Sequence, residues 1–498
     1  MSLTDDKVKS GFYVQNPGNF STKNIIEDFM KTEYQEGLRN EFNMMDALIN
    51  RLPKDTISGK KKYKSFALGV ADNVRAVGNS FDRYELGFST FYNKGVETVE
   101  AEFDTTKLMA TFAITDEAIL KGTGDGSLLD VLKDSLDRME ISLKHTMNRY
   151  TYGAPDGVIG NVTSNKLELV AVATSNNKPS DPRGAEHNIF YGTAPTVIKF
   201  RMSNSHSLLP GMGIMIEHIV PAVKDTTDGS VTRYVGRIWQ KDNSQIHDEV
   251  VIMFVDKVIK AVIGKTDSKQ VSFEDHSIAE DVTIVKDTDT ATVYSRQLDD
   301  AGSINAEYHG LEAILNPTGN YDTIFGVDRN VYTSLKNTVM RLDGTKYLTE
   351  ELLRDMSDHL ALTSPEGTAI SLVCANHRII SSVEKSLMQF KEAIYTQNSS
   401  GYQLGRPDIK FDNFVLVKDK YSRDANVYML DQAKIGELVR RDFTWITSGE
   451  VNSVLQRRPG TELYEGIMNK YADMYIDAWR CHGIITNVKT PDVGVRMQ

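Results

Sequence analysis

The chain has 498 residues, a formal net charge of −11 at pH 7, 40% hydrophobic residues and a mean hydropathy of −0.35. This composition is typical of a globular protein and excludes a fibrous or an intrinsically disordered chain. The negative charge also opposes a function that depends on gripping nucleic acid phosphates, which requires a concentrated basic face, so we expect any DNA contact to be local.

The length predicts two or three packing units of roughly 100 to 200 residues each. No segment approaches the roughly 18 consecutive apolar residues that a bilayer span requires. The N-terminus lacks the apolar region of a secretory signal, so we expect synthesis and function in a reducing cytoplasm. Cys374 and Cys481 are the two cysteines of the chain, too few for a disulfide framework.

The N-terminal segment divides into a polar arm and a helix. Residues 1–21 are polar with scattered aromatic residues, which suggests an arm that lies on another surface. From Ile25 to Leu48 apolar residues recur at three- and four-residue spacing until Pro53, which predicts an amphipathic helix that ends there.

Residues 55–103 combine glycine punctuation with seven aromatic residues between Tyr63 and Tyr92, which predicts a long, irregular hairpin. An isolated hairpin is marginally stable in water, so this one needs a surface, on its own subunit or on another. The basic run Lys60–Lys64 at its base has three candidate partners: DNA, an acidic patch on a neighbouring subunit, or water alone. Water is favoured, since charge runs are usually solvated.

Two features then follow closely in the chain. Residues 99–103 and 108–114 alternate apolar and polar side chains at period two, which predicts strands with one buried face. A glycine-rich turn, Gly122–Gly126, precedes Ser127 and Asp130, which form a capping signal for a helix over 127–152. Because the turn lacks the Lys-Ser/Thr pair of a phosphate loop, it is interpreted as a turn and cap. We assign the core stripe of this helix to Leu129, Leu132, Leu136, Met139, Leu143 and Met147.

The residue pattern of the remaining chain changes twice. Residues 155–303 hold β-branched runs separated by turn residues, which predicts a small all-β barrel or sandwich. From Tyr308 onward helices and strands alternate, which indicates a mixed α/β domain. In that domain we expect helices over 348–362 and 378–390 and strands over 368–374, 413–417 and 426–430. The extended stretch 463–488 could return to the first sheet.

No catalytic, cofactor-binding or metal-binding motif occurs in the sequence, so we predict that the chain is not an enzyme and needs no cofactor. The pairs Cys374/His377 and Cys481/His482 lack the four-ligand spacing of a zinc site and are interpreted as buried thiols near a histidine. The acidic pairs Asp299-Asp300 and Glu350-Glu351 are expected on solvated faces or at helix starts.

The order of these features resembles tailed-bacteriophage major capsid proteins, whose fold is the Hong Kong phage 97-like capsid fold. The fold class that this implies is α+β, with an N-arm, an extended loop, a peripheral domain with a spine helix, an axial domain and, in this chain, an inserted all-β domain. The similarity covers nearly the whole chain and rests on architecture, since no short diagnostic motif carries it.

The resemblance implies a division of the chain into six segments. They are 1–54 (N-terminal arm and helix), 55–104 (extended β-hairpin loop), 105–154 (peripheral domain with spine helix 127–152), 155–303 (inserted β-rich domain), 304–462 (axial α/β domain) and 463–498 (C-terminal strand returning to the peripheral domain).

The resemblance also implies a structural function. Subunits would self-assemble as pentamers and hexamers into an icosahedral shell that encloses phage double-stranded DNA without sequence-specific binding. Assembly would take place in the host bacterial cytoplasm and the protein would reside in the virion, away from any membrane, with scaffolding, portal and decoration proteins as further partners. Burial of the hairpin on a neighbouring subunit explains its aromatic content. The subunit contacts inferred on it are Arg75, Arg83, Tyr84, Phe88, Phe91 and Tyr92.

Three alternatives stay open. An encapsulin-type compartment shell shares this fold and encloses enzymes, so the cargo would discriminate it. A phage tail or baseplate protein would form tubes or rings. A hydrolytic enzyme ranks last, because no nucleophile, base and orienting residue form a recognisable motif.

Overall fold

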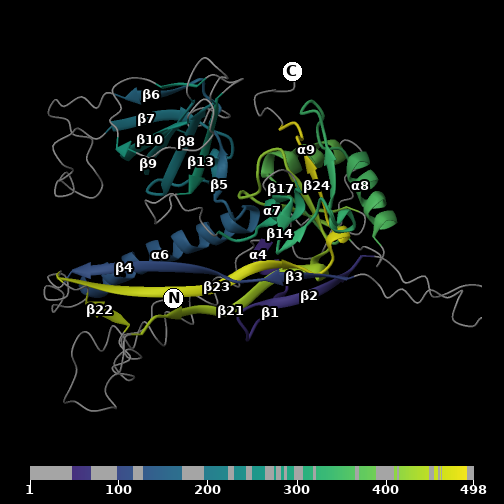
Figure 1. The fold of residues 1–498 in the computed structure, drawn as a ribbon, viewed down its shortest axis with the longest axis horizontal. Helices are drawn as coiled ribbons and strands as arrows, with labels where there is room; N and C mark the ends of the chain where they lie inside the picture. Colours follow the sequence, from purple (N-terminus) through teal and green to yellow (C-terminus); the bar gives the residue numbers. More distant parts are fainter. Residues whose placement is uncertain are drawn as a thin grey trace, which may run out of the picture. The chain divides into compact units, whose positions relative to one another are not determined.

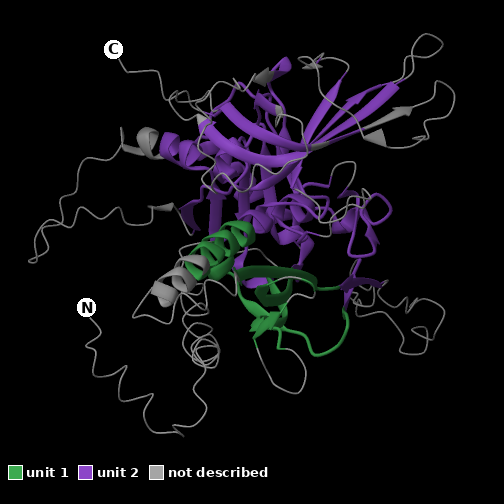
Figure 2. Cartoon of the chain, turned by 90° about the vertical axis from the view of Figure 1, so that its left-hand side faces the viewer, with its two compact units in different colours: residues 1–62, 104–148, 436–473 green, residues 63–103, 149–435, 474–498 purple. Residues whose placement is uncertain are grey.

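The structure is a computed structural model (Figure 1). It describes residues 48–68, 98–115, 127–170, 196–221, 229–242, 250–263, 274–275, 282–284, 289–295, 307–317, 321–364, 370–388, 409–411, 414–447, 454–457, 460 and 462–490. The predicted N-terminal arm and all but the end of the predicted N-terminal helix fall outside these ranges. The chain forms two compact units, shown in green and purple in Figure 2: unit 1 (1–62, 104–148, 436–473) and unit 2 (63–103, 149–435, 474–498).

Unit 1 is built on a five-stranded sheet whose members come from distant parts of the sequence. The strands are β1 (Lys54–Thr56), β21 (Ile435–Trp445), β23 (Leu463–Ile476), β22 (Leu455–Arg457) and β4 (Thr106–Thr115). β1 runs parallel to β21, and β21 lies beside β23. The short helix α4 (Leu48–Arg51) ends before Pro53, where the sequence predicts the end of a helix.

The longest pairing in unit 1 joins β4 to β23 in antiparallel register, from Thr106 opposite Ala472 to Thr115 opposite Leu463. Leu108, Phe112 and Ile114 are buried, as the period-two alternation predicts. Gly466 leaves room for the Phe112 ring, because a Cβ atom there would lie 2.2 Å from it.

Helix α6 spans Ser127–Tyr152, the range that the capping signal and the apolar stripe predict. Leu136, Met139, Leu143 and Met147 of the predicted stripe are at most 6% exposed, whereas Ile141 on another face is 60% exposed. The backbone of Leu129 and Leu132 is helical, and their side chains lie outside the described part. From Leu136 onward the helix therefore has one buried and one exposed face.

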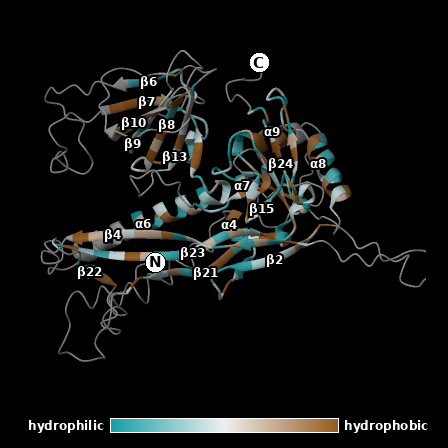
Figure 3. Cartoon of the chain, viewed as in Figure 1, coloured by the Kyte–Doolittle hydropathy of each residue, from teal (hydrophilic) through white to brown (hydrophobic). Residues whose placement is uncertain are grey.

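The first part of unit 2 is a nine-stranded sheet. Its strands are β5 (Val158–Asn161), β6 (Lys166–Val170), β7 (Thr196–Arg201), β8 (Gly213–Val220), β9 (Gly229–Asp242), β10 (Val250–Ile263), β11 (Glu274–Asp275), β12 (Val282–Thr283) and β13 (Thr290–Ser295). The main order is β12-β6-β7-β10-β9-β8-β13-β5. Figure 3 colours the chain by hydropathy, and the paired strands β6 and β7 each hold both hydrophobic and hydrophilic residues.

This sheet closes on itself into a barrel. β5 pairs with β13 while β6, which follows it in the chain, pairs with β7. Between them, Val162 N donates to Ala291 O at 2.8 Å and Thr163 N to Arg201 O at 2.8 Å. The interior is one apolar cluster that includes Phe200. At the base of the barrel, Ser295 N donates to Gly157 O at 3.0 Å, so the chain enters and leaves at adjacent positions.

The second part of unit 2 is a six-stranded mixed sheet in the order β16-β24-β20-β17-β19-β18. These strands are β16 (Thr338–Arg341), β17 (Leu372–Ala375), β18 (Ile409–Phe411), β19 (Phe414–Lys418), β20 (Val427–Leu430) and β24 (Gly483–Thr486). Helices α8 (Glu350–Thr363) and α9 (His377–Met388) contribute to the same core. Thr349 Oγ1 accepts from Leu352 N at 3.4 Å, so Glu350-Glu351 marks a helix start, as predicted.

The remaining described elements are short. They are β2 (Lys62–Ala67), β3 (Thr98–Phe103), α7 (Leu311–Leu315), β14 (Thr323–Ile324), β15 (Val327–Asp328) and the 3-10 turns Ser205–Ser207, Thr333–Leu335, Gln432–Lys434 and Trp479–Cys481.

The structure differs from the sequence-based segments at the C-terminal end. The stretch 463–488 divides: β23 pairs with β4, whereas β24 belongs to the six-stranded sheet. In addition, β21 and β22 join the sheet of β4, although the predicted boundary at residue 462 groups them with the α/β domain. The reason is physical, since a period-two pattern identifies a strand and leaves its partner open.

Candidate assembly elements

The described part of the predicted hairpin is its base, where β2 and β3 form a two-stranded sheet. The chain between them, residues 69–97, lies outside the described residues. The predicted subunit contacts all fall in that range: Arg75, Arg83, Tyr84, Phe88, Phe91 and Tyr92. What the structure establishes is therefore how the two ends of this segment are held.

Aromatic side chains fix the base of the hairpin within unit 2. Phe66 of β2 contacts Trp479 edge-to-face, with ring centroids 6.0 Å apart. Phe103 of β3 lies 4.5 Å from the Phe325 ring and 6.5 Å from the Tyr475 ring, measured between centroids. Phe66 is 7% exposed and Phe103 is 1% exposed. Both ends of the undescribed segment thus start from buried anchors.

The basic run at the same base has partners that the sequence analysis did not consider. Lys62 forms an ion pair with Asp55, and this hydrogen bond lowers the pKa of the Asp55 carboxyl. Lys64 pairs with Asp477 and lies over the Phe66 ring, 5.4 Å from its centroid. Two lysines of the run therefore contact carboxylates of their own chain.

A buried ion pair crosses the sheet of unit 1. Lys470 Nζ of β23 lies 2.7 Å from Glu437 Oε1 of β21, and Lys54 Nζ of β1 lies 4.0 Å from Glu437 Oε2. Lys470 Nζ also stands 5.1 Å from the centroid of the Phe443 ring. These opposite charges on adjacent strands favour one register over its neighbours, because a slip would leave a charge buried without its partner.

Arg329 is the second buried charge that sequence reasoning missed, and it is 0% exposed. Its guanidinium donates to Ile314 O at 2.6 Å, to Ala313 O at 3.0 Å and to Tyr321 O. The first two carbonyls belong to α7, so the arginine satisfies groups that the end of a helix leaves without a donor. Burial lowers the pKa of Arg329 to about 10. An arginine in a loop gives no sequence signal of such a position.

Chemistry-bearing residues elsewhere take structural positions. Cys374 and Cys481 are both buried, as predicted, and form no disulfide with each other. No group of three or more His, Cys, Asp or Glu side chains within the described ranges is arranged to hold a metal ion. Of the helices that the structure describes, none combines the length and the apolar character needed to cross a membrane.

No family model and no curated protein matches the chain. Among solved structures, the chain is similar to one from the cyanophage A-1(L) capsid asymmetric unit, with 9% identity, a TM-score of 0.45 and coverage of 90% of this chain and 93% of that one. A second similar chain is from the satellite phage P4 procapsid, with 8% identity, a TM-score of 0.35 and coverage of 91% and 99%.

A third similar structure is the SrpI encapsulin complex from Synechococcus elongatus PCC 7942, with 10% identity, a TM-score of 0.24 and coverage of 38% of this chain and 62% of that one. All three TM-scores are below 0.5, so the proposed function rests on the elements of the chain itself.

Proposed function

We propose that this chain is the major capsid protein of a tailed bacteriophage. Its subunits assemble as pentamers and hexamers into an icosahedral shell that encloses double-stranded DNA, and the protein resides in the virion. The peripheral domain of this proposal includes α6, β4 and β23, the axial domain is the six-stranded α/β part, and the barrel is the inserted domain.

The observation that carries the proposal is the pairing of β4 with β23 together with the long helix α6. β4 directly precedes the segment that leads to α6, a helix of 26 residues, and β23 returns to pair with β4 after the whole barrel and most of the α/β part. The chain therefore first forms β4 and α6, then the barrel and most of the α/β part, and then β23. The resemblance to capsid proteins implies the same order for the segments 105–154, 155–303, 304–462 and 463–498.

The hairpin between β2 and β3 is proposed to lie across a neighbouring subunit. The described chain on either side of residues 69–97 is anchored at Phe66 and at Phe103. Head-to-tail contacts of this kind close into rings of five and six subunits. The side chains proposed to make them are Tyr84, Phe88, Phe91, Tyr92, Arg75 and Arg83, with burial of the aromatic residues as the driving force.

The first test is to express the full chain alone and to examine it by negative-stain electron microscopy and sedimentation. Closed polyhedral shells or rings of five and six subunits are the expected result. If the chain stays monomeric, a scaffolding partner is added, and continued absence of shells overturns the proposal. Tubes would instead indicate a tail protein, and shells that enclose enzymes would indicate a compartment.

A second test isolates the hairpin. Deleting residues 78–92 is expected to leave the subunit folded, because the anchors Phe66 and Phe103 remain, and to abolish shells. Circular dichroism checks the fold and sedimentation checks assembly. Intact shells from this deletion would contradict the contact between subunits, while an unfolded product would show that the hairpin belongs to its own subunit.

A further inference from the structure

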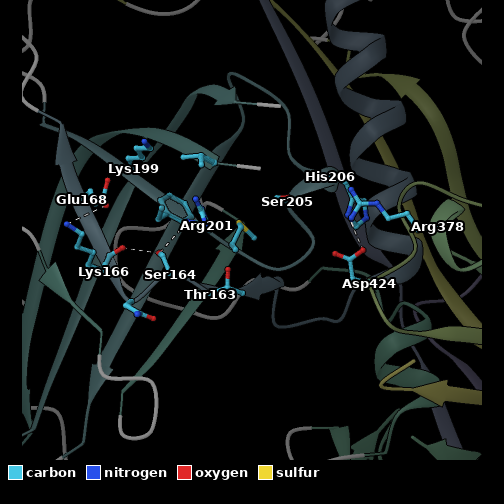
Figure 4. Close-up of a pocket in the computed structure, with 14 residues that line it drawn as sticks. Thr163, Ser164, Lys166, Glu168, Lys199, Arg201, Ser205, His206, Arg378 and Asp424 are labelled. Atoms are coloured by element: carbon cyan, nitrogen blue, oxygen red, sulfur yellow. Dashed lines mark hydrogen bonds and ion pairs between the residues drawn. The ribbon is translucent and has the colours of Figure 1, made fainter. Parts of the chain in front are cut away.

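A polar cleft of about 610 Å³ lies within unit 2, on the outside of the barrel. One wall comes from β6, β7 and the turn before β6, and the other from the segment after β7, from α9 and from the loop before β20 (Figure 4). The charged side chains that line it are Lys166, Glu168, Lys199, Arg201, Arg378 and Asp424, and His206 also lines it.

The barrel wall presents cations on one face of two paired strands. Leu167 of β6 and Phe200 of β7 are 1% and 2% exposed and belong to the barrel interior. Because side chains alternate along a strand, Lys166 and Glu168 beside Leu167, and Lys199 and Arg201 beside Phe200, lie on the outer face. Glu168 stands opposite Lys199 in the antiparallel register. This face carries three cations for one carboxylate, and Lys166 Nζ lies 3.4 Å from Glu168 Oε1, which leaves Lys199 and Arg201 of β7 in excess.

The opposite wall has a carboxylate, Asp424, that already accepts hydrogen bonds from neighbouring residues. Asp424 Oδ2 accepts from Asn204 N at 3.1 Å and Asp424 Oδ1 accepts from Asn376 Nδ2 at 3.1 Å. His206 Nδ1 lies 3.6 Å from Oδ1. Burial opposes ionisation of this group, but the hydrogen bond from His206 and the nearby charge of Arg378 keep the pKa of Asp424 below its usual range. Asp424 is thus an anion that its own neighbours satisfy.

The charge of the cleft is opposite to that of the chain. Lys166, Lys199, Arg201 and Arg378 outnumber Glu168 and Asp424, whereas the whole sequence carries a net charge of −11. Cations held close together repel one another, and an anion between them removes that repulsion. Concentrating them in one concave site thus favours an anionic ligand.

We propose that this cleft binds a multivalent oxyanion, with Lys199 and Arg201 of β7 on one side of the ligand and Arg378 of α9 on the other. The volume accommodates a ligand larger than a single inorganic ion, and the guanidinium groups suit phosphate or carboxylate oxygens. This inference is independent of the proposed capsid function, since it concerns binding to one subunit.

The walls of the cleft are fixed by hydrogen bonds among its own residues. Asp424 N donates to Asn204 Oδ1 at 2.7 Å, which completes a reciprocal pair with the bond from Asn204 N. On the barrel side, Arg201 N donates to Ser164 Oγ at 3.3 Å, and Ser164 Oγ donates to Lys166 O at 2.9 Å. A site that is ordered before the ligand arrives loses less entropy on binding.

The test uses the purified full chain and two probes, inorganic pyrophosphate and citrate, in isothermal titration calorimetry at low ionic strength. Saturable binding of one ligand per chain, weakened by added NaCl, is the expected result. Tighter binding of pyrophosphate would identify a phosphate-bearing ligand, and tighter binding of citrate a carboxylate-bearing one. If neither probe binds, the proposal is overturned.

Variants locate the binding. Lys199→Ala/Arg201→Ala is expected to raise the dissociation constant at least about tenfold, since each charge-assisted hydrogen bond contributes that much. Arg378→Ala, from the other wall, is expected to do the same. The control Arg341→Ala/Lys346→Ala removes the same two charges from exposed positions outside the cleft and should leave binding within about twofold. If Lys199→Ala/Arg201→Ala bound the probes as tightly as Arg341→Ala/Lys346→Ala does, the proposed location of the site would be wrong.

Discussion

Lys470 Nζ and Glu437 Oε1 lie 2.7 Å apart, with side chains 3% and 1% exposed. Replacing one partner leaves the other charge buried with less compensation, so Lys470→Met is expected to lower the free energy of unfolding by about 3 to 5 kcal/mol. The double variant Lys470→Met/Glu437→Leu should recover much of that loss, because both charges are gone. Urea-induced unfolding of the three proteins measures the difference.

An exposed ion pair supplies the comparison for that experiment. Arg354 and Glu350 are one turn apart on α8, 2.8 Å from atom to atom, with side chains 60% and 39% exposed. Arg354→Ala should therefore change the free energy of unfolding by less than about 0.5 kcal/mol. If Lys470→Met cost no more than this control, the pair in the sheet would not be a buried interaction.

Helix α6 has two apolar positions at which a new charge should change the free energy of unfolding by very different amounts. Leu136 is 1% exposed, and Leu136→Asp would bury an unpaired carboxylate, with an expected loss of about 4 kcal/mol or more. Ile141 is 60% exposed, so Ile141→Asp should stay within about 1 kcal/mol. Solubility and circular dichroism distinguish the two variants, and a normally folded Leu136→Asp protein would refute the burial of this stripe.

Arg329 should not tolerate replacement by another cation. Lys keeps the charge but cannot donate to Ala313, Ile314 and Tyr321 carbonyls in the planar geometry of the guanidinium. At least one buried carbonyl would lose its donor, so Arg329→Lys is expected to reduce the free energy of unfolding by about 1 to 3 kcal/mol. Thermal unfolding checks this, with Arg341→Lys at an exposed position as the control. Equal melting temperatures for Arg329→Lys and the unsubstituted chain would contradict the stabilising role of the guanidinium hydrogen bonds.

The stability of the chain should fall in mild acid because of His482. Burial lowers the pKa of His482 to about 4, from 6.5. Above about pH 6.5 the imidazole is neutral in both states, and the native state keeps its full stability. As the pH falls toward about 4 the unfolded chain takes up the proton first, which removes up to roughly 3 kcal/mol. Urea unfolding at several pH values measures the slope.

A variant separates this histidine from the other titrating groups. His482→Gln cannot be protonated and can still accept a hydrogen bond from Asp431 N, which His482 Nδ1 accepts at 3.2 Å. Its free energy of unfolding should depend less on pH between about 6.5 and 4 than that of the unsubstituted chain. The same slope in both proteins would show that other groups cause the acid sensitivity.

Local signals made the helices and strands predictable. The bounds of α6 follow from a glycine turn, a capping residue and an apolar stripe, and all three act within a few residues of one another. The alternation of Leu108, Phe112 and Ile114 likewise fixed which face of β4 is buried. The barrel was predictable as a class, since short β-branched runs with turns between them favour a closed β structure.

The pairings and the buried charges were not predictable, because they depend on residues far apart in the sequence. Lys470 and Glu437 meet only through the pairing of β23 with β21. In the sequence, Arg329 cannot be distinguished from a solvated arginine. Its buried position becomes evident only in the fold, where carbonyls of α7 accept its hydrogen bonds. The cationic cleft has the same origin, since Arg378 and the cations of β6 and β7 are separated by most of the barrel and the α/β part.

The hydrogen bond from Ser295 N to Gly157 O places the first and last residues of the barrel next to each other, so the barrel is an insertion with adjacent ends. Since its two ends are neighbours across one strand pair, a short turn could replace everything between them without stretching the chain on either side. The same junction would accept a foreign domain whose own ends lie equally close. The position is therefore a natural point for removing, exchanging or labelling a module of this protein while the rest of the sequence stays unchanged.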